Sequence, residues 1–434
     1  MLSRLEHMRR VLREPNFRYL WLAQSASVIG DNIVMVALAL FVLQRTGSAT
    51  DLGIVLGAHA LSLTAFLLFG GVLADRLPRH RVMVSTDLAR FALHALLAAL
   101  IFAGSVRIWQ VATIEALFGC AEAFFRPAAN GLLPQTVAEE DIQEATAVTT
   151  MSNNLAEFLG PALATALVLG AGAGWAFALD ACTFLVSALL LIRVRPRTRT
   201  ATQAQQPQQQ PETEREGMWA ELREGAREVR SRAWVWATLA SFSVALFCGL
   251  APWYVLGPAI AREQYHHLSV YGFLETSVGV GTIMGAILGI GWRPRYPMRT
   301  AMLAIAVWPL CAILYASGVT LVLVLPAGVV AGISVSLFDV WWMTALAERI
   351  DPDALSRVSA FDWMVSGALV PFGYLLAGPL AADLGTVNVM IGGCVLAFLA
   401  FMLGLLPHET RMLERLHDEP TTQPPAEQLR PLGY

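Results

Sequence analysis

Long apolar runs recur along the whole chain and constrain its fold more than any other feature. A helix of about 20 apolar residues spans the hydrocarbon core of a bilayer, and about twelve such runs can be read here. Of the 434 residues, 56% are apolar and only 15% are charged, against about 45–50% and about 25% in soluble domains. We therefore predict an all-α membrane protein. Its spans are expected at 19–43, 52–74, 82–103, 109–130, 146–170, 174–192, 233–257, 271–292, 300–318, 320–345, 360–380 and 384–406.

Arginine supplies all 30 basic residues, and its distribution predicts the orientation of the chain. With the N-terminus inside, the outward loops contain only Arg45, Arg107 and Arg262, and the inward segments contain most of the others. The positive-inside rule then places both termini in the cytoplasm. The absence of lysine excludes a phosphate-loop ATPase and a lysine Schiff base.

Enzymes of other classes also lack support in the sequence. Neither HExxH nor GxSxG occurs, and the five cysteines show no metal-ligand spacing. We expect no enzymatic activity, no metal and no cofactor. The net charge of −3 gives no basis for a nucleic-acid partner, and we expect a monomer in a lipid bilayer.

A glutamine-rich stretch divides the chain into two halves. Six glutamines lie between positions 203 and 210, and such a composition cannot form a packed core. Trp219 to Val229 follow with helical apolar spacing, which indicates an amphipathic helix on the membrane surface or a solvated extension of the next span. The predicted parts are an N-terminal segment (1–18), a six-helix bundle (19–192), a linker (193–232), a second six-helix bundle (233–406) and a tail (407–434).

The two halves resemble each other in sequence. A shift of 219 positions takes Gly53 to Gly272 and Arg76 to Arg295. Parallel repeats of six helices place a substrate site between the halves, near the middle of the membrane.

The cytoplasmic loop after the second predicted span carries a candidate gate. Gly71 would allow close backbone packing, and Asp75 would pair with an arginine or with a helix end. Arg76 and Arg79 supply the positive charge. Such contacts would break and reform when two halves rock against each other.

The sequence GxLADRxxRxR in this loop resembles the signature loop of the major facilitator superfamily, with Pro78 replacing its usual glycine. The stretches SVIGDNIVMVALALF, AEAFFRPAANGLLPQTV and YGFLETSVGVGTIMG are similar to the bacterial drug:proton antiporter branch that includes macrolide efflux proteins and the enterobactin exporter. The resemblance covers 15–406. It implies the major facilitator fold, a bacterial inner-membrane location, and export of a hydrophobic or amphipathic small molecule driven by a proton gradient.

Gly160 and Pro161 resemble the start of the antiporter motif of that family. A Gly-Pro pair loosens the backbone hydrogen bonds of a span, so the pair would bend the helix as a gate. A packing kink without a gating role is the alternative.

Carboxylates within the predicted spans are candidates for coupling, because burying a charge in a membrane costs about 2.5–3.5 kcal/mol on insertion scales. Asp31 lies near the middle of the first span without a cation one turn away in its own helix. Glu115 and Glu122 share a face of the fourth span, where they would hold one proton between them. Arg126 follows Glu122 by four residues and would neutralise it, which makes Glu115 the freer proton carrier.

Other ionisable residues are assigned structural roles. Asp87 and Arg90 have the spacing of an intrahelical pair. His59 and His94 are expected to be hydrogen-bonded packing residues, with proton transfer as the alternative. Asp180 is assigned to helix capping or to the membrane interface.

Two other functions within the same fold remain open. A lysophospholipid or other lipid mover would also use an apolar cavity. An uncoupled facilitator would not respond to a proton gradient.

Overall fold

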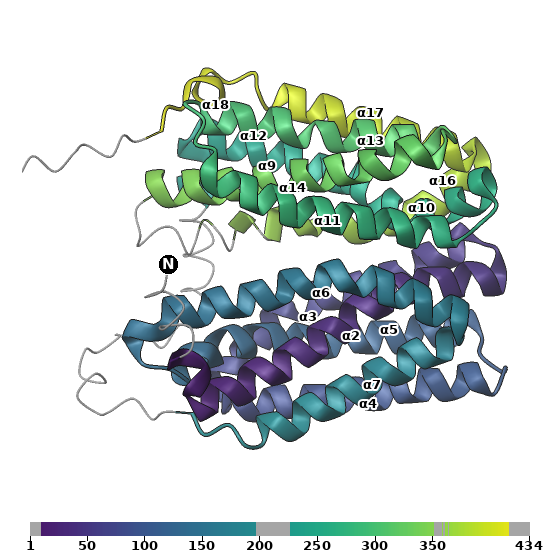
Figure 1. Cartoon of the computed structure of the whole chain (residues 1–434), viewed down its shortest axis with the longest axis vertical. Helices are drawn as coiled ribbons and strands as arrows, with labels where there is room; N and C mark the ends of the chain where they lie inside the picture. Colours follow the sequence, from purple (N-terminus) through teal and green to yellow (C-terminus); the bar gives the residue numbers. More distant parts are fainter. Residues whose placement is uncertain (1–9, 197–225, 351–357, 359–360, 363, 416–434) are drawn as a thin grey trace, which may run out of the picture.

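The computed structural model describes residues 10–196, 226–350, 358, 361–362 and 364–415, and it forms two helical bundles that lie side by side (Figure 1). The first bundle contains α2 (Pro15–Thr46), α3 (Ala49–Arg76), α4 (Arg79–Phe102), α5 (Ile108–Leu132), α6 (Ile142–Gly170) and α7 (Ala173–Leu191). The second contains α9 (Ala233–Ala245), α10 (Ala251–Tyr265), α11 (Ser269–Gly291), α12 (Pro297–Ile305), α13 (Val307–Ala316), α14 (Leu321–Arg349), α16 (Val370–Leu384), α17 (Thr386–Leu403) and α18 (His408–Met412).

Every predicted span in the described ranges coincides with helical residues, and the span at 300–318 is divided at Ala306 into α12 and α13. A π-helical segment (Leu246–Leu250) joins α9 to α10, so the two form one continuous span. Eleven helices among the described residues are long and apolar enough to cross a membrane. The 29-residue α6 is not among them because polar residues fill its first half. The all-helical membrane fold is thus confirmed, and the count of twelve spans stays a prediction.

Short turns connect neighbouring helices. Gly47, with a φ of 70°, ends α2, and the side chain of Ser48 accepts a hydrogen bond from the backbone of Asp51 at the start of α3. A positive φ favours glycine, and serine is a preferred N-cap. Such turns force consecutive helices to run antiparallel.

The same pattern of helix packing occurs in both halves. In the first, α3 and α4 pack on α5, and α2 packs on α6 and α7. In the second, α11 and α12 pack on α14, while α10 packs on α16 and α9 on α17. Each of these pairs occupies equivalent places in a six-helix repeat, which confirms the pseudo-symmetry predicted from the sequence.

Glycine allows the closest of these contacts. A Cβ atom on Gly281 or Gly285 of α11 would lie 2.0 or 2.8 Å from a backbone oxygen of α14. Small residues at such crossings let membrane helices approach closely.

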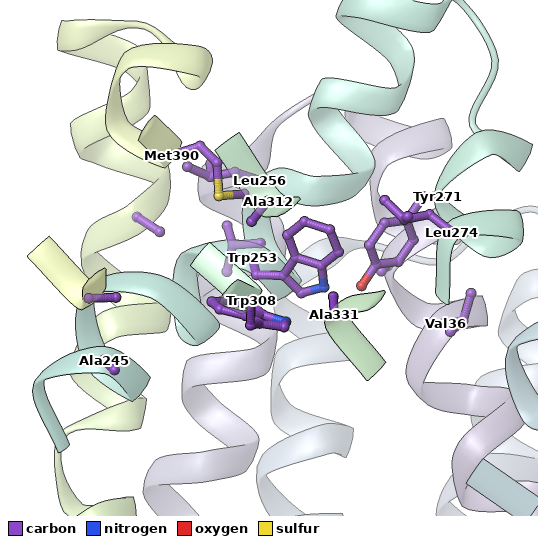
Figure 2. Close-up of a cluster of buried hydrophobic side chains, with 14 of the residues drawn as sticks. Val36, Ala245, Trp253, Leu256, Tyr271, Leu274, Trp308, Ala312, Ala331 and Met390 are labelled. Carbon is purple, nitrogen blue, oxygen red and sulfur yellow. The ribbon is translucent and has the colours of Figure 1, made fainter. Parts of the chain in front are cut away.

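Aromatic side chains fill the core of the second half. Trp253 of α10 lies between Tyr271 and Trp308 (Figure 2), and its indole N–H donates to Glu275 of α11 at 2.7 Å. Trp253 is therefore a buried core residue of this half rather than a residue of an interface belt.

The two halves meet across two seams, α3 with α16 and α6 with α11. We call the end of the molecule that contains the loops beside Arg76 and Arg295 the arginine-rich end. The close contacts lie toward the opposite end: an added Cβ on Gly53 would be 2.4 Å from the backbone oxygen of Tyr374, and Arg262 donates to the backbone oxygen of Gly47 at 2.8 Å. Toward the arginine-rich end the helices of the two halves diverge (Figure 1).

Residues 408–415, which we call the C-terminal clasp, connect three helix ends at the arginine-rich end. Glu409 accepts a hydrogen bond from the first backbone N–H of α9 at 2.8 Å. Glu414 accepts from Arg295 before α12 at 2.9 Å, and Arg415 lies 3.3 Å from Glu348 of α14. In the first half, Asp75 occupies the position of Pro294, so the clasp supplies a carboxylate that the second loop lacks.

Most of the predicted linker and tail lies outside the described residues. Residues 226–231 are helical, Arg232 interrupts the helix before α9, and Val229 is buried. The surface helix and the solvated extension of the next span both stay predictions. The domain boundaries stay predictions.

Candidate functional site

Asp31 lies on α2, and its nearest cation comes from another helix. Arg90 of α4 places Nη1 4.0 Å from Oδ2 of Asp31, at the outer limit of an ion pair. The side chain of Asp31 is 38% exposed, and the neighbouring Asn32 donates to the backbone of Val28 instead. Asp31 is thus only loosely paired.

Arg90 is held tightly by other groups. Its guanidinium donates to Asp87, which also accepts from Ser187 of α7 at 2.6 Å. The guanidinium carbon lies 4.0 Å from the ring centre of Phe125 and 4.4 Å from that of Phe184. The predicted Asp87–Arg90 pair is confirmed, and these contacts offset part of the cost of burying its charges.

Glu115 is not the free carboxylate that the sequence indicated. Its Oε2 lies 3.3 Å from Nδ1 of His59 on α3, and its Oε1 lies 3.5 Å from Nε2 of His94 on α4. Only 4% of its side chain is exposed. The prediction failed because both partners come from other helices, which spacing within α5 cannot reveal.

Glu122 forms the predicted pair with Arg126 and a second contact that was not predicted. Arg126 donates to Oε1 of Glu122 from Nε at 2.8 Å and from Nη2 at 2.5 Å. The other oxygen lies 3.1 Å from Nε2 of His59. A single imidazole therefore bridges Glu115 and Glu122, the two carboxylates on one face of α5.

His94 and Asp180 extend this arrangement into the centre of the first half. Nδ1 of His94 shares a hydrogen bond with Asp180 of α7, and Phe118 stacks on the imidazole at 4.2 Å between ring centres. Asp180 is fully buried, so its assignment to the interface or a helix cap is wrong. We call Asp180, His94, Glu115, His59 and Glu122 the histidine–carboxylate array.

The predicted gating loop is only partly described. Arg79 donates to the backbone oxygen of Gly131 at the end of α5, at 2.6 Å, where the negative end of the helix dipole attracts a cation. The prediction for Gly71 is wrong, because nothing lies within 4 Å of a Cβ placed there, whereas a Cβ on Gly70 would meet Ala123 at 2.1 Å. Arg76 is exposed, and the side chain of Asp75 lies outside the described set.

Gly160 and Pro161 are buried within an uninterrupted α6. A Cβ on Gly160 would lie 2.4 Å from Cβ of Asn32 on α2. This contact supports the packing interpretation, and the gating role stays a prediction.

Carboxylates of the two halves also lie near one another. Asp339 of α14 is close enough to Glu157 of α6 and to Asp362 for their charges to interact. Within the described ranges, no group of three or more His, Cys, Asp or Glu side chains is placed to hold a metal ion.

Comparisons with known proteins match most of the chain. The family model described as Major Facilitator Superfamily matches residues 20–373. Macrolide efflux protein A of Streptococcus pyogenes is 22% identical over 409 residues, covering 92% of this chain and 97% of the relative. The multidrug efflux pump Tap of Mycolicibacterium fortuitum is 26% identical over 393 residues, which cover 87% of this chain and 92% of Tap.

Solved structures share the fold at low sequence identity. A bacterial homolog of the human lysosomal transporter Spinster gives a TM-score of 0.68 at 15% identity, covering 95% of this chain and 99% of that one. A bacterial homologue of the iron transporter ferroportin gives a TM-score of 0.67 at 14% identity, and the match covers 89% of this chain and 98% of that one.

Proposed function

Since this chain belongs to the Major Facilitator Superfamily, we propose that it exports a hydrophobic or amphipathic small molecule across the bacterial inner membrane in exchange for protons. The observation that carries the proposal is the set of ionisable side chains deep within α2, α3, α4, α5 and α7, whose burial in a membrane is costly without a function. The names of two relatives, a macrolide efflux protein and a multidrug efflux pump, support export.

Alternating access follows from the two halves. In this conformation they touch at one end and separate at the arginine-rich end, which the positive-inside rule assigns to the cytoplasm. Substrate would enter there, and rocking about the two seams would expose it to the other side. The loop at Arg76 and Arg79, with Asp75, and the Gly160–Pro161 segment would limit this movement.

Coupling would arise from competition between proton and substrate. Of the two carboxylates paired with Arg90, Asp31 is the more loosely held, and it would bind either one. Glu115, Glu122 and Arg126 would transmit its charge state through their shared contacts. A site that binds proton and substrate in turn moves them in opposite directions.

A lipophilic cation fits this arrangement best. Asp31, Glu157 and Asp339 are carboxylates with exposed or half-exposed side chains, and the guanidinium of Arg90 is already bound by Asp87. The proton gradient would supply the energy without any cofactor.

Transport by the purified protein in liposomes tests the proposal. We expect an imposed pH gradient to accelerate transport of tetraphenylphosphonium or erythromycin. The same gradient should accelerate transport of the anion deoxycholate less. Equal rates with and without the gradient would identify an uncoupled facilitator. Movement of lysophosphatidylcholine alone would identify a lipid mover.

A further inference from the structure

We propose that the histidine–carboxylate array is a proton-binding site, in which the imidazole of His59 transfers protons between Glu122 and the buried Glu115. The inference rests on the proposed function and assigns its proton pathway to particular side chains. It concerns His59 and His94, for which the sequence predicts a packing role with proton transfer as the alternative.

The two ring nitrogens of His59 face different carboxylates. Nδ1 lies 3.3 Å from Glu115, and Nε2 lies 3.1 Å from Glu122. An imidazole can accept a proton at one nitrogen and release another from the second. A residue that only filled space in a helix contact would not need both nitrogens directed at acids.

Three members of the array are almost fully buried and two are partly exposed. The side chains of Asp180 and His94 are 0% and 1% exposed, Glu115 is 4%, Glu122 is 16% and His59 is 24%. Arg126, beyond Glu122, is 53% exposed. His59 and Glu122 therefore connect a fully buried part of the first half with the exposed side chain of Arg126.

One link in the array is incomplete in this conformation. Nε2 of His94 and Oε1 of Glu115 face each other at 3.5 Å, and both atoms are buried without a hydrogen bond. An unsatisfied buried polar pair costs free energy, so a shorter distance or an added proton here would be favourable. Glu115 is thus prepared to receive a proton.

The surrounding charges also favour proton binding. The groups that face the array are Asp31 of α2, Asp87 and Arg90 of α4, and Arg126 of α5. With them the array contains five carboxyl groups, two guanidinium groups and two imidazoles. Even with both imidazoles protonated, one negative charge remains uncompensated, and buried uncompensated charge is costly.

The transfer step balances without any other reactant. A proton on Glu122 binds Nε2 of His59, and the proton on Nδ1 leaves to Glu115. Glu122 ends ionised, Glu115 ends protonated, and the imidazole ends as the other neutral tautomer. In the reverse sequence Glu115 returns its proton to Nδ1 and Nε2 returns its proton to Glu122, which restores the starting tautomer and lets Glu122 release the proton.

The test separates proton transfer from substrate binding. Tetraphenylphosphonium export driven by a pH gradient requires net proton movement, whereas exchange of labelled for unlabelled tetraphenylphosphonium at equal pH does not. We expect His59→Gln to lower gradient-driven export at least tenfold and to leave exchange within twofold of the wild type. His267→Gln, which changes an exposed histidine between α10 and α11, is the matched control and should change neither.

Several outcomes would overturn the inference. Gradient-driven export at the wild-type rate in His59→Gln is one, and loss of exchange together with driven export in a variant that melts like the wild type is another. Glu122→Gln, which keeps the imidazole, should also uncouple export, and normal coupling in it would exclude the route even if His59→Gln fails to fold. Wild-type protein that shows exchange but no gradient-driven export would instead refute the proposed function.

Discussion

The guanidinium of Arg90 pairs tightly with one carboxylate and loosely with another, which gives the two carboxylates different roles. It donates to Asp87 and lies against two phenyl rings, but it only approaches Asp31 at 4.0 Å. Protonation of Asp87 would break a buried ion pair, whereas protonation of Asp31 would leave that pair intact. Asp31 can therefore change its charge with little effect on the fold.

Asp31→Asn tests this distinction. We expect normal insertion and folding, since the lost ion pair is loose, and a decrease in gradient-driven export of about a hundredfold, within the range for loss of a proton-transferring group. The measurement is initial export rate in liposomes together with the melting temperature.

The matched control for that experiment is Asp383→Asn. Asp383 is exposed near the end of α16 and should have no effect on either quantity. An Asp31→Asn protein that exports at the wild-type rate would remove Asp31 from the coupling mechanism.

The histidines mark the limit of what the sequence can predict about this site. The pairs Asp87–Arg90 and Glu122–Arg126 follow from helical spacing, and both form. The contacts of Glu115 with two imidazoles depend on how α3, α4 and α5 pack, which spacing within one helix does not determine. The sequence did contain one signal that these residues lie close together, namely their similar depth along the predicted spans.

Four of these residues lie at a similar depth along their helices. Asp180 and Glu115 lie seven residues into α7 and α5, His94 lies eight residues before the end of α4, and His59 lies ten residues into α3, all counted from the end opposite the arginine-rich one. At about 1.5 Å per residue, each is roughly 10–15 Å from that end, near the middle of a bilayer. Ionisable residues at one depth in neighbouring spans are therefore candidates for a shared site.

At the scale of secondary-structure elements, the C-terminal clasp stabilises helix ends that the loops alone do not connect. Its ion pairs are largely exposed, and each such pair contributes only about 0–1 kcal/mol. The hydrogen bond of Glu409 to the start of α9 and the burial of Thr410 add further contacts.

Truncation tests the contribution of the clasp. A chain that ends after Pro407 should melt several degrees below a chain that ends after Arg415, because only the first lacks the contacts to α9, α12 and α14. Thermal unfolding of both purified proteins in the same detergent measures the difference. Equal melting temperatures would show that the clasp does not stabilise these helices.

For the whole molecule, most of the architecture was predictable from the sequence. Long apolar runs determine where helices occur, and the resemblance of the halves implies their pseudo-symmetry. The seams were not predictable, because the glycines that form them carry no side chain and their partners lie in the other half. Gly53 and Gly71 illustrate this: both lie in α3, but only Gly53 meets the other half.

Gly53→Ala should destabilise the conformation described here. Alanine adds helix propensity of about 1 kcal/mol at either glycine, but at position 53 its Cβ would lie 2.4 Å from the backbone oxygen of Tyr374. Overpacking of this kind costs about 1–3 kcal/mol. We expect a lower melting temperature and slower export for Gly53→Ala.

Gly71→Ala is the comparison for stability, since nothing lies within 4 Å of the added atom. It should melt at or above the wild-type temperature. Similar shifts in both variants would show that the halves do not approach closely at Gly53.

The two seams have a consequence for how the protein can evolve. α3 against α16 and α6 against α11 exchange places when the halves are exchanged, so rocking of one half on the other would change both seams. A mutation that enlarges a side chain on one seam would therefore open that seam more than the other. Suppressor mutations that restore growth on a toxic substrate should then arise about half a chain length away, on the opposite seam, rather than beside the first change.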